Sequence, residues 1–147
     1  MRKIAFLILM VTASFGYEAK VVKIVDGDTI KILKNNNQIS VRLYGIDAPE
    51  KRQDFGGVSK KALSNKIALK NVQIKEFGKD RYKRTIAKVY LNDEDICKFM
   101  VENGYAWAFI KYSKDYAIDE KYARENRLGL WKDKTPISPW EWRKKLN

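Results

Sequence analysis

The chain has 147 residues, and its 45% of hydrophobic residues is enough for the core of one domain. It contains no histidine, which excludes the Ser-His-Asp triad, histidine-ligated zinc and a histidine base, so acid–base chemistry is left to carboxylates, lysine, tyrosine or bound water. The formal net charge of +12 favours a polyanionic partner, with nucleic acid, an anionic membrane surface and an acidic polysaccharide as the open classes.

The N-terminal segment has the layout of a secretory signal peptide. Arg2 and Lys3 give a basic start, residues 4–11 form an unbroken apolar run, and mostly small residues follow. The run is shorter than the about 20 residues that a transmembrane helix needs. We expect residues 1–16 to be a signal peptide cleaved after Gly16, with an uncleaved anchor or a buried first strand as the alternatives. The mature chain, residues 17–147, is then secreted or periplasmic and meets a membrane only during export.

Short strands dominate the first part of the mature chain. Alternating apolar residues between turn signals predict strands at residues 20–25, 29–33, 39–44, 72–77 and 85–91. An Asp-Gly pair, Asp26-Gly27, marks the turn between the first two strands. The first three strands therefore form a meander.

Apolar residues at helical spacing lie between and after the strands. They predict helices at residues 59–70, 95–103 and 116–127, with Ser59 as the N-cap of the first and Gly104 at the end of the second. The tail carries two tryptophans that we expect to pack back onto the domain. Cys97 is the only cysteine, so no intramolecular disulfide can form, and we expect it to be a small core residue.

Five short strands combined with helices indicate an α+β fold that is mainly β. We expect a small closed antiparallel barrel of the OB type, with five strands and with three helices packed on it. The strand face and the loops of such barrels commonly bind oligonucleotides.

Acidic residues lie at two of the predicted turns. Asp26 and Asp28 flank the glycine of the first hairpin, and Asp47 and Glu50 follow the third strand. In a meander these two points can lie at the same end of the sheet. Asp28 and Asp47 are therefore candidate ligands of a hard cation such as Ca²⁺ or Mg²⁺. Ordinary turn chemistry explains each aspartate equally well when it is taken alone.

The residue between Asp47 and Pro49 offers a third oxygen. Proline restricts Ala48 to an extended backbone and supplies no N–H of its own. The Ala48 carbonyl is then free to face a metal.

Two arginines accompany the acids. Arg42 alternates with Val41 and Leu43 and therefore points away from the face that they share, and Arg84 begins a later strand. Two guanidiniums can hold a phosphodiester from two sides and stabilise the added negative charge of a five-coordinate phosphorus. Lysine does this less well because it lacks the planar fork. A cross-strand ion pair for Arg42 and a solvated loop position for Arg84 are the alternatives.

Seven short motifs follow one another along the mature chain: VDGDTI, VRLYGIDAPE, FGGVSKKAL, DRYKRTIAKVY, VENGYAWA, GLW and PWEWRK. Together they resemble the staphylococcal (micrococcal) nuclease family, also called the thermonucleases. The resemblance implies a five-stranded OB barrel with three helices, and a secreted or periplasmic Ca²⁺-dependent nuclease domain at residues 17–147. It implies hydrolysis of DNA and RNA to 3′-phosphate products, and we expect a preference for single strands.

The resemblance also implies a role for each candidate residue. Asp28, Asp47 and the backbone carbonyl of Ala48 correspond to the calcium ligands. Glu50 corresponds to the glutamate that activates the attacking water, and the catalytic residues Arg42 and Arg84 to the arginines that bind the scissile phosphate. Contacts to neighbouring nucleotides are implied for three more residues: Arg81, Tyr82 and Tyr112.

Three positions depart from the family pattern. Ala48 stands where the best-known member has threonine, a change that a carbonyl ligand tolerates. Lys83 replaces a glycine that often precedes the arginine, and Ile110 stands where a second tyrosine is expected. The changes concern the turn before Arg84 and the stacking of bases, and the catalytic set is complete.

Two other classes compete with an enzyme. One is a non-catalytic OB-fold module that grips single-stranded nucleic acid, and the other is a cationic adhesin for acidic surface polymers. Neither needs the complete set of acids and arginines described above. We therefore expect a monomeric enzyme with DNA and RNA as substrates and with no stable protein partner.

Overall fold

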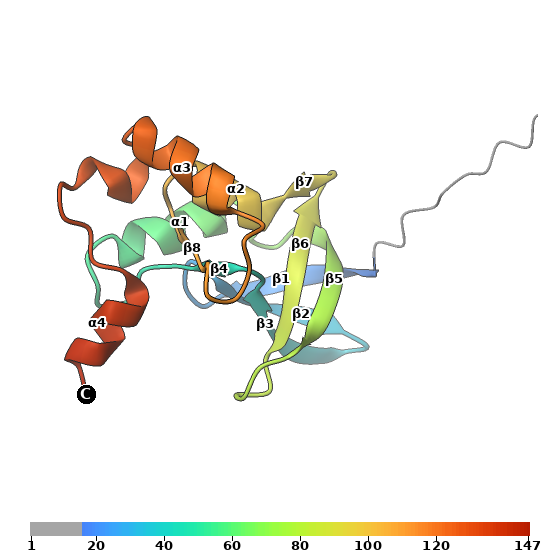
Figure 1. The fold of residues 1–147 in the computed structure, drawn as a ribbon. Coiled ribbons are helices and arrows are strands. Elements are labelled where there is room, and N and C mark those ends of the chain that lie inside the picture. The colour runs from blue at the N-terminus through green and yellow to red at the C-terminus, as the bar shows by residue number, and fades with distance from the viewer. Residues whose placement is uncertain (1–15) are drawn as a thin grey trace, which may run out of the picture.

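A computed structural model describes residues 16–147 (Figure 1). Residues 1–15 lie outside the described part, and with them nearly all of the predicted signal peptide. The strands are β1 (Tyr17–Ile24), β2 (Thr29–Lys34), β3 (Asn37–Leu43), β4 (Ile46–Asp47), β5 (Asn71–Lys79), β6 (Thr85–Leu91), β7 (Glu94–Asp95) and β8 (Trp107–Ala108). The helices are α1 (Gly56–Ile67), α2 (Ile96–Glu102), α3 (Ala117–Glu125), the 3-10 helix η1 (Gly129–Lys132) and α4 (Pro139–Lys145).

Five long strands form the OB-type barrel that the sequence predicted. Their order is β3-β2-β1-β5-β6, with antiparallel neighbours, and β7 continues the sheet beyond β6. The barrel closes where β3 pairs with β6, and this pair is parallel, with Arg42 opposite Ile86. The expectation of a wholly antiparallel barrel is wrong at this seam, because an odd number of strands cannot alternate in direction all the way round a ring. The parallel seam brings the start of β6 beside the end of β3.

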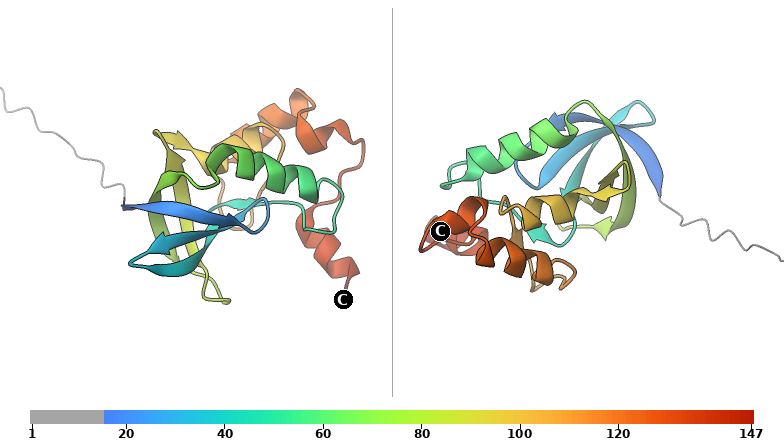
Figure 2. Two further views of the ribbon diagram at one scale, coloured as in Figure 1. Left: turned by 180° about the vertical axis from the view of Figure 1, so that it is seen from behind. Right: turned by 90° about the horizontal axis from the view of Figure 1, so that it is seen from above.

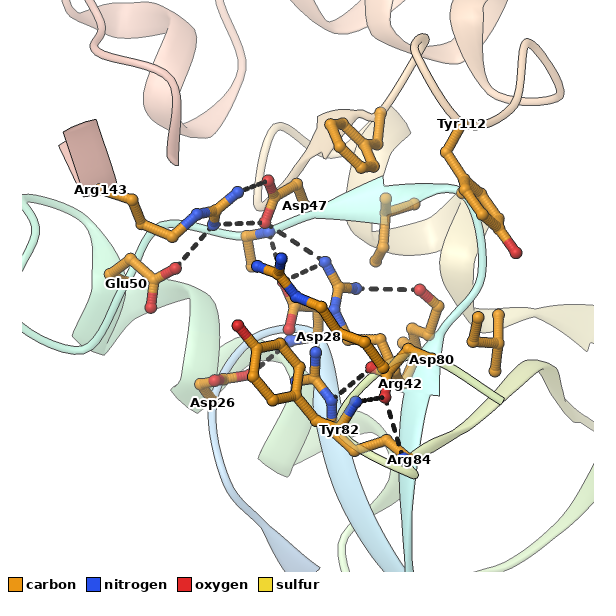
Figure 3. A pocket seen from close by; sticks show the side chains of 17 residues that line it. Asp26, Asp28, Arg42, Asp47, Glu50, Asp80, Tyr82, Arg84, Tyr112 and Arg143 are labelled. Carbon is orange, nitrogen blue, oxygen red and sulfur yellow. Dashed lines mark hydrogen bonds and ion pairs between the residues drawn. The ribbon is translucent and has the colours of Figure 1, made fainter. Parts of the chain in front are cut away.

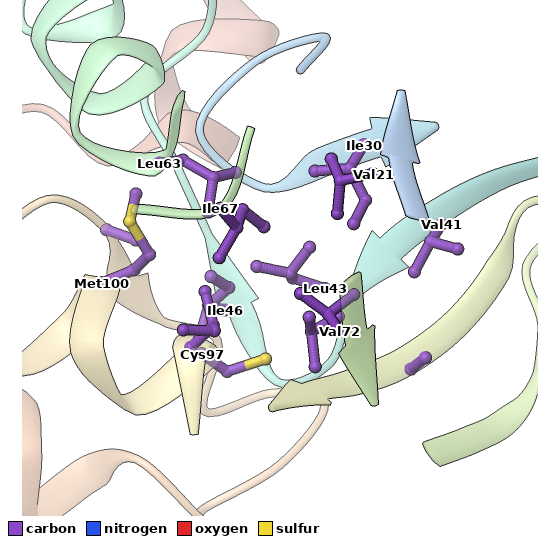
Figure 4. Close-up of a cluster of buried hydrophobic side chains, with 14 of the residues drawn as sticks. Val21, Ile30, Val41, Leu43, Ile46, Leu63, Ile67, Val72, Cys97 and Met100 are labelled. Carbon is purple, nitrogen blue, oxygen red and sulfur yellow. The ribbon is translucent and has the colours of Figure 1, made fainter. Parts of the chain in front are cut away.

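The barrel shares its hydrophobic core with α1 and α2 (Figure 4), and a smaller second cluster lies between α3 and η1. Val21 and Ile30 alternate inward along their strands and are fully buried, as are Leu63 and Ile67, which lie one turn apart on α1. Cys97 of α2 is also buried and unpaired, as predicted. The helices lie along one side of the barrel, as the two further views show (Figure 2). The opposite side of the barrel is therefore left to strands and turns.

The first helix begins earlier than predicted. Its N-cap is Phe55, which has a left-handed backbone, φ 72°, and no side-chain cap. The prediction of Ser59 as the N-cap is therefore wrong. Ser59 lies inside α1, fully buried, and its hydroxyl donates to the carbonyl of Tyr105 at 2.7 Å. The serine ties α1 to the segment after α2, a tertiary use that local sequence does not reveal.

The second helix ends at the predicted glycine, and its N-cap is the first residue of the predicted range. Asp95 caps α2 by accepting a hydrogen bond from the Lys98 N–H at 3.1 Å. Gly104 follows the helix with φ 72°, the left-handed conformation that glycine adopts without strain. None of the helices within residues 16–147 is long and apolar enough to cross a membrane.

The tail forms a fourth α-helix, where the sequence predicted three. Ser138 and Glu141 make a capping box at the start of α4, and Pro139 occupies its first turn. Trp140 packs against Trp107 with ring centroids 5.4 Å apart, so the tail folds back as predicted. The helix is too short for apolar periodicity to indicate it, because one hydrophobic face needs a longer window to repeat.

Candidate active site

Asp28 joins two loops at one end of the barrel, and it is 6% exposed. Its Oδ2 accepts a hydrogen bond from the Ala48 N–H at 2.7 Å, and its Oδ1 accepts one from the Thr29 hydroxyl at 3.0 Å. Its backbone carbonyl accepts the Leu43 N–H at 2.8 Å. These bonds hold the first hairpin turn against the segment that carries Asp47.

Gly27 allows this approach because it has no side chain. A Cβ atom at this position would overlap the Ser59 hydroxyl and lie 2.8 Å from the Ala48 Cβ. Both neighbours are held in place, Ser59 by its bond to Tyr105 and Ala48 by its bond to Asp28. The turn that carries Asp28 can therefore lie between α1 and the Ala48 loop only with glycine at this position.

Arg42 lies against both buried aspartates (Figure 3). Alternation along β3 buries Val41 and Leu43 in the core and turns Arg42 the other way, as predicted. Its Nη2 is 3.3 Å from Asp28 Oδ2 and 3.3 Å from Asp47 Oδ1. Its Nη1 donates to the carbonyl of Leu43 at 3.0 Å. One guanidinium thus counters two carboxylates that water hardly reaches.

Arg84 enters the same cleft from the turn before β6. Asp80 accepts from the Arg84 Nε at 2.7 Å and from its backbone N–H at 3.0 Å. The Nη1 of Arg84 is 3.3 Å from the Thr29 hydroxyl oxygen, to which it donates. Lys83 has φ 62°, so the turn keeps the left-handed conformation that favours glycine although the residue is lysine. The departure at Lys83 therefore leaves Arg84 aimed into the cleft.

Glu50 lies at the edge of the cleft beside an arginine from the tail. Arg143 of α4 donates from Nη1 to Glu50 Oε1 at 2.7 Å and from Nη2 to Asp47 Oδ2 at 2.8 Å. Figure 3 shows the Arg143 side chain between these two acids. Asp47 is 1% exposed, so it is a buried carboxylate with two arginines against it.

All the site residues predicted from the sequence line one cleft of about 440 Å³. Tyr82 is 65% exposed, and its ring lies 4.9 Å from the guanidinium carbon of Arg81 and 5.5 Å from that of Arg84. Tyr112 is half exposed and meets the edge of Tyr44, with centroids 5.6 Å apart. Both rings are open to a stacking partner. The position where the family pattern expects a second tyrosine holds Ile110, which does not line the cleft and offers no ring to a base.

Crowded carboxylates give the cleft its electrostatic character. Burial, and then the negative charge of Asp28, raise the pKa of Asp26 to about 7. Burial also raises the pKa of Asp47, although hydrogen bonds from Arg143 and the charge of Arg42 oppose the rise. When the pKa of a carboxyl group stays raised although an arginine lies beside it, a further cation would stabilise its ionised form.

The oxygen atoms present suit a hard cation that keeps water ligands. Among residues 16–147, no three acidic, histidine or cysteine side chains form a metal cage by themselves. The carboxylates of Asp28 and Asp47 line the cleft beside the Ala48 carbonyl. That carbonyl accepts no hydrogen bond within the described chain, although Ala48 is buried. Two carboxylates and an unpaired carbonyl are ligands that Ca²⁺ prefers.

Two residues of the site, Asp80 and Arg143, were not predicted from the sequence. Asp80 lies four residues before Arg84 in a charged turn, and that spacing is a signal that could have identified it as the anchor of the arginine. Arg143 belongs to the PWEWRK motif, but the motif does not show that the residue meets the acids, because the tail reaches them only through tertiary packing.

Comparison with known proteins identifies the class. Residues 40–133 match a family model described as staphylococcal nuclease homologue. An uncharacterized endonuclease of Haemophilus influenzae is 46% identical over 142 residues, which cover 95% of this chain and 80% of the relative. A micrococcal nuclease of Shigella flexneri is 40% identical over 151 residues, which cover 94% of this chain and 87% of the relative. The chain belongs to the staphylococcal nuclease family, as its motifs predicted, and it is a nuclease that hydrolyses phosphodiesters.

Gly27→Ala tests the close approach beneath Asp28. The added methyl group overlaps Ser59, so we expect the free energy of unfolding to fall by about 1–3 kcal/mol in urea titrations. We also expect nuclease activity to fall in the folded variant, because the turn that carries Asp28 must shift. Gly57→Ala is the matched control, since its Cβ would meet nothing within 4 Å. Equal stability and activity in the two variants would contradict this explanation.

Proposed function

We propose that the protein is an exported, Ca²⁺-dependent nuclease that hydrolyses DNA and RNA, preferably single-stranded, to 3′-phosphate products. The observation that carries the proposal is the meeting of Arg42 and Arg84 in one cleft with the aspartates Asp28 and Asp47. Arginines alone would suit a binding module, and acids alone would suit a metal site. Their combination suits the cleavage of a phosphodiester by metal-assisted water attack.

The carboxylates of Asp28 and Asp47 and the carbonyl of Ala48 would hold Ca²⁺, which would supply positive charge beside the phosphate and the attacking water. Asp28 is already oriented for this role, because hydrogen bonds from Ala48 and Thr29 fix both of its carboxylate oxygens.

Glu50 is the group that orients and deprotonates the attacking water. Its Oε1 is held by Arg143, whereas its Oε2 has no hydrogen-bond partner among residues 16–147. The side chain is 36% exposed, so water reaches it. A carboxylate with one fixed and one open oxygen is placed to take a proton.

Arg42 and Arg84 stabilise the extra negative charge of the five-coordinate phosphorus. The Nη2 of Arg84 donates no hydrogen bond within the described chain and is available to the phosphate. Attack in line with the 5′ oxygen breaks the P–O5′ bond and leaves the phosphate on the 3′ oxygen. Arg84 lies beside Tyr82, so the same wall of the cleft binds phosphate and offers a ring to a base.

Arg84→Ala should lower kcat by about 100- to 1000-fold, because it removes one of two guanidiniums that act on the transition state. Cleavage of a fluorescent single-stranded oligonucleotide measures the effect, and circular dichroism checks the fold. Arg52→Ala removes an equal charge from an exposed position outside the cleft and should retain activity. Near-normal turnover in Arg84→Ala would show that Arg84 does not stabilise the transition state.

The proposed metal and substrate are tested with purified residues 17–147. We expect cleavage of single-stranded DNA and of RNA with Ca²⁺, loss of cleavage with a chelator, and recovery when Ca²⁺ is restored. End-group analysis should find phosphate on the 3′ oxygen. Binding without cleavage under every metal condition would support the alternative, a non-catalytic OB-fold nucleic-acid-binding protein.

Export is supported by the basic, apolar and small-residue zones of the N-terminus, and β1 begins at Tyr17, directly after the proposed cleavage point. Expression of the full chain in a bacterial host should yield a product outside the cytoplasm that starts at Tyr17. Mass spectrometry of the intact protein measures this. A chain that retains Met1 and stays in the cytoplasm would overturn the proposal of export.

A further inference from the structure

Arg143 connects two acids of the cleft from a helix outside the matched family segment. The family model covers residues 40–133, whereas α4 begins at Pro139. The Nη2 of Arg143 donates to Asp47 Oδ2 at 2.8 Å. Its Nη1 donates to Asp47 Oδ1 at 3.2 Å and to Glu50 Oε1 at 2.7 Å. Only arginine can make these three bonds, because its planar guanidinium faces the carboxylate of Asp47 with both terminal nitrogens and also reaches Glu50.

A second link holds the tail against the loop of Glu50. The Gln53 side chain accepts the Glu50 N–H at 3.0 Å and donates to the Ile137 carbonyl at 2.6 Å. Gln53 is 7% exposed, so its amide is a buried bridge between the loop and the residues just before α4. Trp140 anchors the same helix against Trp107. The Gln53 bridge before α4 and the packing of Trp140 within it therefore fix the position of Arg143 at the edge of the cleft.

We propose that Arg143 is a positioning residue of the nuclease, whose guanidinium holds the carboxylates of Asp47 and Glu50 in one fixed relation. This inference rests on the proposed function, in which Asp47 holds the metal and Glu50 takes the proton. By occupying Oε1 of Glu50, Arg143 leaves Oε2 as the oxygen that meets water. By facing Asp47 with both nitrogens, it sets the plane of a buried carboxylate that no backbone N–H holds among the described residues.

Arg143→Lys tests the shape of the guanidinium separately from its positive charge. Lysine keeps the positive charge but cannot bridge both carboxylates with a planar fork. We expect kcat to fall about tenfold or more while KM for a single-stranded oligonucleotide changes by less than about threefold, as for other residues that orient ligands of a metal. Lys145→Ala, a charge change on the same helix with no contact to the acids, should leave both constants unchanged. Unchanged kcat in Arg143→Lys would overturn the proposal.

Calcium binding gives a readout that does not depend on turnover. We expect isothermal titration to show several-fold weaker Ca²⁺ binding in Arg143→Lys than in the wild type. A helix that matters only for folding would instead lower the melting temperature and leave kcat and Ca²⁺ affinity intact, which contradicts the proposal. If the wild type binds Ca²⁺ but does not cleave, the proposed function fails and the affinity of Arg143→Lys alone decides on Arg143. A wild type that neither cleaves nor binds Ca²⁺ overturns both.

Discussion

The contact of Arg42 with Asp28 and Asp47 is the interaction on which the rest of the site depends. Two carboxylates this deeply buried repel each other, and an uncompensated buried charge strongly destabilises a fold. Arg42 offsets both charges, and it can do so because its neighbours Val41 and Leu43 are fixed in the core. The barrel that buries those neighbours therefore also aims the arginine.

The closing seam of the barrel extends this arrangement to the second arginine. Because β3 and β6 run parallel, Val41 pairs with Thr85, and the residue before Thr85 is Arg84. Asp80 then holds Arg84 in the turn. The acids and arginines of the cleft lie against one another, so each group offsets part of the charge of the other. The large positive charge elsewhere draws the polyanion toward the cleft.

The strands and the outward face of Arg42 were predictable because two-residue alternation is a local property of the sequence, and the burial of Cys97 was predictable from the apolar residues around it in a short helix. The shared cleft of Asp28 and Asp47 was predictable once a meander was inferred, since a meander returns to the same end of the sheet. The parallel seam could also have been inferred, since five strands in a closed barrel require one parallel pair. The contacts of Ser59 and Arg143 could not, because they join segments that meet only after folding. No local pattern encodes such contacts, although the PWEWRK motif marked the tail as part of the family pattern.

A structure of the protein with Ca²⁺ and an oligonucleotide whose scissile linkage resists hydrolysis would show where metal and phosphate bind. We expect one phosphate held between Arg42 and Arg84, with Ca²⁺ on Asp28, Asp47 and the Ala48 carbonyl, and with Glu50 facing the phosphorus from the side opposite the 5′ oxygen. A phosphate bound elsewhere on the basic surface, with no metal on Asp28 and Asp47, would contradict this expectation.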